Sequence, residues 1–269
     1  MNVMLAFATK EFQDHVRNGW IISLAAAFAL FALVISLAGF GFTGNVGSME
    51  TGAALRSLTS LALYLIPLMG LLLGYDGIAG ERERGTLDLL RSYPVSAVQV
   101  TLGKLFGLGS VMGLTLFLGL LAPALLALGT ESETSWWVWP AFLVLAVWLG
   151  TIFIALAIWL STLAQERSTV LGLAIAVWLV LVLLFDLGLI GLLVATEGAI
   201  PAALVHVSFI LNPASLFRVM MLGLLMGETT LKEMGFGAGG VPWVGLWAGA
   251  FLWSMIPIWL AARRLGRME

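Results

Sequence analysis

Residues 140–163 read PAFLVLAVWLGTIFIALAIWLSTL, a run of 24 positions without one charged side chain. Such a run can cross a bilayer as one helix, because about 20 apolar residues span the roughly 30 Å of hydrocarbon. The rest of the chain is similar, since 61% of its 269 residues are hydrophobic and 10% are charged. A bilayer accepts apolar surface on every side of a helix, whereas one soluble core could not hide so much. The sequence therefore predicts an all-α polytopic membrane protein.

The chain contains six apolar runs of this kind. The predicted spans are about 20–42, 57–78, 101–128, 140–163, 169–195 and 241–262. A further segment, 204–227, is also apolar, but Asn212-Pro213 interrupts it, and proline disfavours helix at the residue before it. We expect two helices with a break there, within 200–235, forming an outer hairpin that dips into the membrane. A solvent-exposed helix pair outside the membrane is the alternative.

The basic residues set the predicted orientation, because lysine and arginine near span ends stay in the cytoplasm. With six spans and cytoplasmic N- and C-termini, three basic residues lie outside: Arg56, Arg218 and Lys232. The ten inside are Lys10, Arg17, Arg82, Arg84, Arg91, Lys104, Arg167, Arg263, Arg264 and Arg267. A seventh span at 204–227 would move the last three of these outside and bury Arg218 at mid-depth, which is costly. The charges therefore favour six spans.

The N-terminal stretch 1–18 has a different pattern. Val3, Met4 and Phe7 recur at helical spacing opposite Lys10 and Glu11, which is typical of an amphipathic helix at a membrane interface. The apolar run that follows is longer than the core of a signal peptide. We therefore expect an interface helix at 1–18 followed by a retained first span.

The charge and the missing motifs of the sequence argue against several functions. The net charge of −2 argues against nucleic acid as a partner, and the absence of cysteine removes disulfides and thiolate metal sites. No G-x-x-x-x-G-K-[ST] loop is present to bind a nucleotide, and the spans carry no H-E-x-x-H motif or comparable catalytic pair. An intramembrane enzyme therefore lacks its catalytic groups, and energy for any active process must come from another chain.

The densest charge in the chain lies at 80–94, GERERGTLDLLRSYP, between the second and third spans. Leu87 and Leu90 share one face of a short predicted surface helix, and Arg84 and Asp88 form an i,i+4 pair on another. Three acids balance three arginines, so the helix has no net attraction to anionic lipid. Mixed charge beside an apolar ridge suits a groove on another protein, and a solvated cytoplasmic loop is the alternative.

These residues carry a resemblance to a known family. Glu81-Arg82-Glu83-Arg84-Gly85-Thr86-Leu87, then Pro94-Val95-Ser96 and Gly103-Lys104, resembles the E-x-E-x-G-T-L…P-V-S…G-K signature of ABC-2-type transporter permeases. The resemblance implies that 80–94 is a coupling helix docked on a cytoplasmic ATPase subunit. Its implied contact residues are Glu81, Arg82, Glu83, Arg84, Gly85, Thr86, Leu87, Asp88, Leu90 and Arg91.

Within that family, WWVWP at 136–140 and LNPASLFR at 211–218 are similar to permeases that serve assembly of the copper centre of nitrous oxide reductase. This implies a homodimer in the bacterial inner membrane, two ATPase copies that hold ATP and magnesium, and a periplasmic accessory protein at the outer face. No cofactor is expected on this chain itself. A copper ion, a sulfur species and a mechanical signal are all compatible cargos, and a passive scaffold for the periplasmic protein is the alternative function.

Four residues are candidates for a translocation path or outer gate. Asp186 is the one acid well inside a predicted span, where a carboxylate usually faces a cavity or a partner; a hydrogen-bonded packing role is the alternative. Tyr64 lies near a proline that could kink the second span, and Asn212 and Pro213 break the outer segment.

A metal site is not predicted, although thioethers suit Cu(I). Met220, Met221 and Met226 lie in one apolar helix, where methionine more often fills gaps. His206 lies near a span end, where a lone histidine is usually interfacial.

Overall fold

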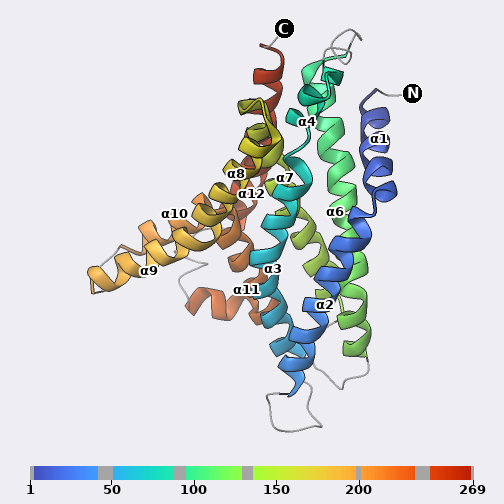
Figure 1. Cartoon of the computed structure of the whole chain (residues 1–269). Helices are drawn as coiled ribbons and strands as arrows, with labels where there is room; N and C mark the ends of the chain where they lie inside the picture. The colour runs from blue at the N-terminus through green and yellow to red at the C-terminus, as the bar shows by residue number, and fades with distance from the viewer. Residues whose placement is uncertain are drawn as a thin grey trace.

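The computed structural model describes residues 3–41, 51–87, 95–128, 136–197, 201–233 and 243–267, and within these ranges every regular element is a helix (Figure 1). Five helices are long and apolar enough to cross a membrane, and a bent pair at the start raises the number to six. The predicted class, an all-α polytopic membrane protein, is confirmed.

The first half of the chain contains α1 (Val3–Arg17), α2 (Trp20–Gly41), α3 (Thr51–Gly74), α4 (Ala79–Glu83) and α6 (Ala97–Leu128). The second half contains α7 (Val138–Leu163), α8 (Arg167–Trp178), the π-helix η1 (Leu179–Leu184), α9 (Phe185–Ala195), α10 (Ala202–Leu211), α11 (Pro213–Glu233) and α12 (Trp243–Leu265).

Helix α7 forms the centre of the bundle, and small residues let α3 approach it closely. A Cβ added at Gly70 would lie 2.7 Å from the carbonyl oxygen of Gly150, and one at Gly74 would lie 2.6 Å from the Cβ of Ala157. Real Cβ atoms do not come so near to other atoms. The contact between α3 and α7 therefore depends on these glycines, as small-residue contacts do in membrane bundles generally.

Helix α1 packs along the first part of α6, next to which it lies in Figure 1. A Cβ at Gly103 would lie 2.6 Å from the Cβ of Phe7, and one at Gly107 would lie 2.7 Å from the carbonyl oxygen of Ala8. The chain then bends by 70° into α2. The helix predicted for the membrane interface is thus held against the bundle by close backbone contact.

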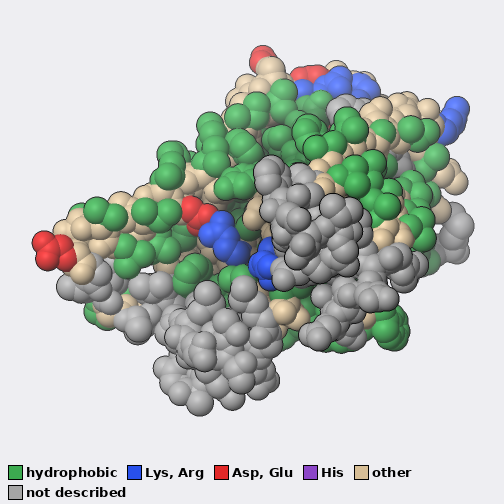
Figure 2. All heavy atoms as spheres, turned by 90° about the horizontal axis from the view of Figure 1, so that it is seen from below, with side chains coloured by type: hydrophobic (Ala, Val, Ile, Leu, Met, Phe, Trp, Pro, Cys, Tyr) green, Lys and Arg blue, Asp and Glu red, His purple; other side chains and the backbone are tan. Residues whose placement is uncertain are grey.

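Both chain termini and α4 lie at one end of the bundle, which we call the α4 end (Figure 1). Seen from the opposite end, the described surface is mostly hydrophobic, with few acidic and basic side chains in view (Figure 2).

Helices α8, η1 and α9 form one continuous rod, Arg167–Ala195, that leans away from the other helices (Figure 1). The outer segment follows it as two helices. Helix α10 ends at Leu211 and α11 begins at Pro213, with extended backbone at Asn212 between them. The break thus lies at the residue pair that predicted it.

The charged stretch, predicted as one helix over 80–94, is interrupted at Gly85 in the part that the structure describes, with helix on both sides of it at Ala79–Glu83 and at 86–87. Helix α4 ends at Glu83, and Gly85 has a φ of 70°. This left-handed conformation, which glycine adopts without strain, ends the helix. Residues 88–94, including the predicted contacts Asp88, Leu90 and Arg91, lie outside the described residues.

Candidate functional site

The start of α4 is fixed by a side chain from the central helix. The hydroxyl oxygen of Ser161 accepts hydrogen bonds from the backbone N–H groups of Ile78 and Ala79, at 2.9 and 2.8 Å. The first N–H groups of a helix have no partner within the helix, so a buried helix start needs acceptors from elsewhere. Ser161 supplies this cap from α7, and it places the acidic residues of α4 against the bundle.

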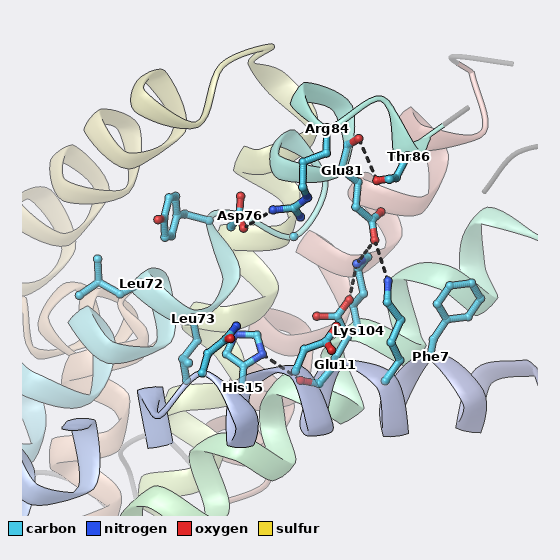
Figure 3. A pocket seen from close by; sticks show the side chains of 15 residues that line it. Phe7, Glu11, His15, Leu72, Leu73, Asp76, Glu81, Arg84, Thr86 and Lys104 are labelled. Atoms are coloured by element: carbon cyan, nitrogen blue, oxygen red, sulfur yellow. Dashed lines mark hydrogen bonds and ion pairs between the residues drawn. The ribbon is translucent and has the colours of Figure 1, made fainter. Parts of the chain in front are cut away.

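Lys104 forms the centre of a buried charge cluster with Glu81 and Glu11 (Figure 3). The Lys104 ammonium donates to Glu81 Oε1 at 2.8 Å and to Glu11 Oε1 at 2.5 Å. The Lys104 side chain is 1% exposed and that of Glu81 is 5% exposed. One lysine on α6 thus joins an acid on α4 to an acid on α1.

The charges of this cluster act on the titration of Glu11. Burial of Glu11 opposes its negative charge, but the adjacent Lys104 ammonium, with Lys10, outweighs that effect and lowers the pKa of Glu11 below its usual value. Lys10 also lies 3.8 Å from Glu81 Oε1. Two buried acids therefore have two basic partners, as buried charges generally require.

A second group of ion pairs holds the other side of α4. The backbone N–H and Nε of Arg167 donate to Glu83 at 2.7 and 2.6 Å. Asp76 lies 3.3 Å from Arg167 Nη1 and 3.3 Å from Arg84 Nη1. Because Arg167 is the first residue of α8, these bonds tie α4 to the start of the α8–η1–α9 rod.

Two further features fix this geometry. A Cβ at Gly80 would lie 1.8 Å from Asp76 Oδ1, so the Asp76 carboxylate occupies the space over that glycine. Arg82 Nη1 donates at 2.6 Å to the carbonyl oxygen of Ala164, just past the end of α7. We call this set the α4 junction: Glu11, Asp76, Glu81, Arg82, Glu83, Arg84, Lys104, Ser161 and Arg167.

An open cavity of about 520 Å³ lies beside the α4 junction, between α1, the end of α3 and α4 (Figure 3). Its lining is mixed, with Lys10, Asp14 and Arg84 among the charged residues and Leu72 among the apolar ones. Its position leaves the polar side of α4 accessible from the α4 end.

The structure divides the predicted coupling residues into two groups. Glu83, Arg84, Gly85 and Thr86 are exposed, whereas Glu81 is buried in the charge cluster. Leu87, predicted to form a ridge toward a partner, is 4% exposed and packs against Ile78, Val100 and Leu265 of this chain. Arg84 Nη1 donates to Oδ2 of Asp76, eight residues earlier, at 3.3 Å; its predicted partner Asp88 lies outside the described residues.

A second polar cluster surrounds Asp186 in the other half of the chain. Arg218 Nη2 donates to Asp186 Oδ2 at 2.5 Å, and Ser215 Oγ donates to Asp186 Oδ1 at 3.3 Å. The Asn212 side chain donates to the carbonyl oxygen of Leu181 in η1 at 2.6 Å. The structure thus brings together the predicted gate candidates Asp186, Asn212 and Pro213.

Sequence reasoning missed Arg218 as the partner of Asp186. The sequence did contain a sign of this pair, because Asp186 and Arg218 are isolated charges of opposite sign in two apolar segments. Tyr64 lies apart from this cluster on α3, with an exposed side chain, and its carbonyl oxygen accepts a bond from Trp178 Nε1 at 3.0 Å.

The methionine candidates lie mainly in apolar surroundings. Met220 and Met221 are buried in the main hydrophobic core. The side chains of Met226 and His206 lie outside the described part of the chain.

A bundle of helices long and apolar enough to cross a membrane, with a short charged helix fixed at one end, defines the class of polytopic membrane proteins. The model of the ABC-2 family transporter proteins matches residues 5–269, so the chain belongs to this family and is an ABC transporter permease. It is 37% identical over 267 residues to the probable ABC transporter permease protein NosY of Stutzerimonas stutzeri, covering 97% of each chain. It is also 37% identical over 226 residues to the protein of the same name from Pseudomonas aeruginosa, covering 82% of each.

Proposed function

We propose that this permease converts ATP hydrolysis by a separate subunit into movement of its spans, with the ATPase docked at α4. The observation that carries this proposal is the α4 junction. Glu81 bonds Lys104 of α6, which bonds Glu11 of α1, and Glu83 bonds Arg167 of α8. A force applied to α4 therefore acts on several long helices at once.

The docking surface in this proposal has an inner and an outer side. Glu81 and Leu87 anchor the charged stretch to the permease, because both are buried within it. Arg84, Gly85 and Thr86 are exposed and provide the contact with the ATPase, together with Asp88, Leu90 and Arg91 further along. ATP and magnesium belong to the ATPase subunit.

The wider assembly follows from the same proposal. The permease acts as a homodimer in the bacterial inner membrane, with both termini and α4 in the cytoplasm, two ATPase copies below it and a periplasmic accessory protein above it. The excess of lysine and arginine in the segments assigned to the cytoplasm supports this orientation. The likeness to the two NosY proteins supports a role in maturing the copper site of nitrous oxide reductase.

The docking proposal is tested by co-expressing the tagged chain with the candidate ATPase subunit and measuring recovery and ATP hydrolysis. We expect Arg84→Ala to weaken association on the order of tenfold, or to uncouple hydrolysis, because an exposed contact charge is lost. Arg263→Ala is the matched control, because Arg263 is an exposed arginine of α12 whose guanidinium lies over the Trp259 ring of its own helix, 5.1 Å from the ring centroid.

Unchanged association and unchanged coupled hydrolysis in Arg84→Ala would remove α4 as the docking site. A stable complex with a periplasmic protein that never hydrolyses nucleotide would favour the scaffold function instead. For the cellular role, cells lacking this chain should make nitrous oxide reductase without its copper absorption bands, measured on the purified enzyme.

A further inference from the structure

The rod α8–η1–α9 is the least buried of the long helices that the structure describes. Of its most apolar 18 residues, 11% lie buried, against 39% to 67% in the four other helices of spanning length. Apolar packing within the protomer therefore holds the rod weakly. A helix held in this way moves with the elements to which its polar bonds attach it.

At the α4 end, those bonds go to the α4 junction. Arg167, the first residue of the rod, donates twice to Glu83 and lies 3.3 Å from Asp76. Glu83 is the last residue of α4, and Asp76 lies in the turn just before α4. The near end of the rod is therefore attached to the short helix that the ATPase moves in the proposed function.

Beyond the middle of the rod, the bonds go to α11. Leu181 accepts a bond from Asn212, and Asp186 accepts bonds from Arg218 and Ser215. Asn212 also accepts a bond from the N–H of Ala214 at 2.9 Å and so caps the α11 start, where Pro213 takes the first helical position. The beginning of α11 is thus bonded to both η1 and α9.

The attachment coincides with the π-helix η1. A π turn carries one more residue than an α turn and has poorer hydrogen bonds, and such turns often occur where a helix changes shape. The Asn212 amide bonds a carbonyl group within this turn. The start of α11 is bonded to Leu181 within η1 and to Asp186 just after it. A change in the shape of the helix at the end of η1 would therefore move the start of α11 as well.

From this geometry we propose that Asp186, Arg218 and Asn212 are positioning residues that make α11 follow the rod, so that displacement of α4 reaches the outer helix pair. The proposal rests on the proposed function only for the source of the displacement. The link between Arg167 and α11 consists of contacts within this chain, so it can be tested without any ATPase.

The test is hydrogen–deuterium exchange of the purified full chain in lipid nanodiscs, followed by mass spectrometry of peptides covering 213–219. We expect Arg167→Ala to speed exchange there on the order of tenfold, although the substitution lies at the other end of the rod, because charge-assisted hydrogen bonds are lost. Arg263→Ala removes an arginine from the same end of the bundle, and exchange at 213–219 should not change.

Coupling is shown by combining substitutions. Asp186→Asn alone should speed exchange at 213–219, and adding Arg167→Ala should then have no further effect there, because α11 is already detached. The exchanged pair Asp186→Arg with Arg218→Asp should restore the original rate. Should that variant not fold, Asp186→Glu retains the carboxylate and should keep the slow rate.

Two results would overturn the proposal. One is an unchanged rate at 213–219 in Arg167→Ala, which would mean that the rod transmits nothing. The other is an equal effect of Arg167→Ala with and without Asp186→Asn, which would mean that transmission bypasses the pair. Neither result bears on whether an ATPase docks at α4, so failure here and failure of the proposed function are distinguishable.

Discussion

Replacing Lys104 by methionine should destabilise the chain more than any other single change at the α4 junction. The side chain is 1% exposed and its ammonium holds two carboxylates, at 2.5 and 2.8 Å. Methionine fills a similar volume but leaves Glu11 and Glu81 buried without their shared ammonium, with the exposed Lys10, 3.8 Å from Glu81, as the remaining cation of the cluster. Removing one partner of a buried ion pair costs about 3–5 kcal/mol, and water screens this cluster little because all three side chains are mostly buried.

The assay is thermal unfolding of the purified chain in mild detergent, followed by the fluorescence of its 11 tryptophans. At about 2–4 °C per kcal/mol for a protein of this size, Tm should fall by roughly 6–20 °C. Lys10→Met is the matched control, because Lys10 is 54% exposed and lies 3.8 Å from Glu81. A long ion pair whose lysine remains in solvent contributes little, about 0–1 kcal/mol.

A triple variant separates loss of charge pairing from loss of packing. Lys104→Met combined with Glu11→Gln and Glu81→Gln contains no buried charge, so most of the lost stability should return. The reasoning is wrong if the single variant loses less than about 1 kcal/mol. It is also wrong if the triple variant is less stable than the single one, since packing would then explain the loss.

Four further substitutions, one of them a control, test the geometry around the junction and the bundle centre. Ser161→Ala should cost about 1–3 kcal/mol in the same assay, because the N–H groups of Ile78 and Ala79 lose their acceptor; no loss would mean that another acceptor replaces Ser161. Gly70→Ala should cost about 1–3 kcal/mol by pushing α3 off α7, whereas Gly109→Ala should be tolerated because its Cβ would lie 3.6 Å from Thr151. Gly80→Ala should displace the Asp76 carboxylate, 1.8 Å from the new Cβ, and lower ATP hydrolysis by the complex with little change in Tm; full hydrolysis would show that the Asp76 pairs are dispensable.

The helical class could be predicted because a bilayer leaves a chain few options. Backbone polar groups in hydrocarbon must be satisfied internally, so a long uncharged run such as 140–163 has to form a helix, and α7 occupies Val138–Leu163. Asn212-Pro213 was equally informative. Proline suits the first turn of a helix and disfavours helix before it, and the two outer helices separate there.

The partners of the charged residues could not be predicted in the same way. Glu81 has arginines as chain neighbours, yet it pairs with Lys104 of α6, and that lysine also binds Glu11 of α1. This pairing depends on how α1 lies along α6. Glycines four residues apart, such as Gly103 and Gly107, permit a close helix contact but do not identify the helix that makes it, so the buried side of the charged stretch was not predicted.

The pairing of Asp186 with Arg218 depends on the register between the rod and α11. The π-helix adds a residue to one turn, which changes the face on which every later side chain lies. Its sequence, LVLVLL at Leu179–Leu184, is uniformly apolar and gives no sign of this. The direction of the Asp186 side chain therefore could not be derived from periodicity.

The contact between Lys104 and Glu11 also has a consequence for biogenesis. The two residues are 93 positions apart in the chain, and at 5–20 residues per second the ribosome takes about 5–20 s to make that length. During this delay the first helix must wait at the membrane surface, because its binding groove on the third span has not yet emerged. Nascent chains stalled before residue 104 should therefore leave their N-terminal segment open to protease, and longer ones should protect it.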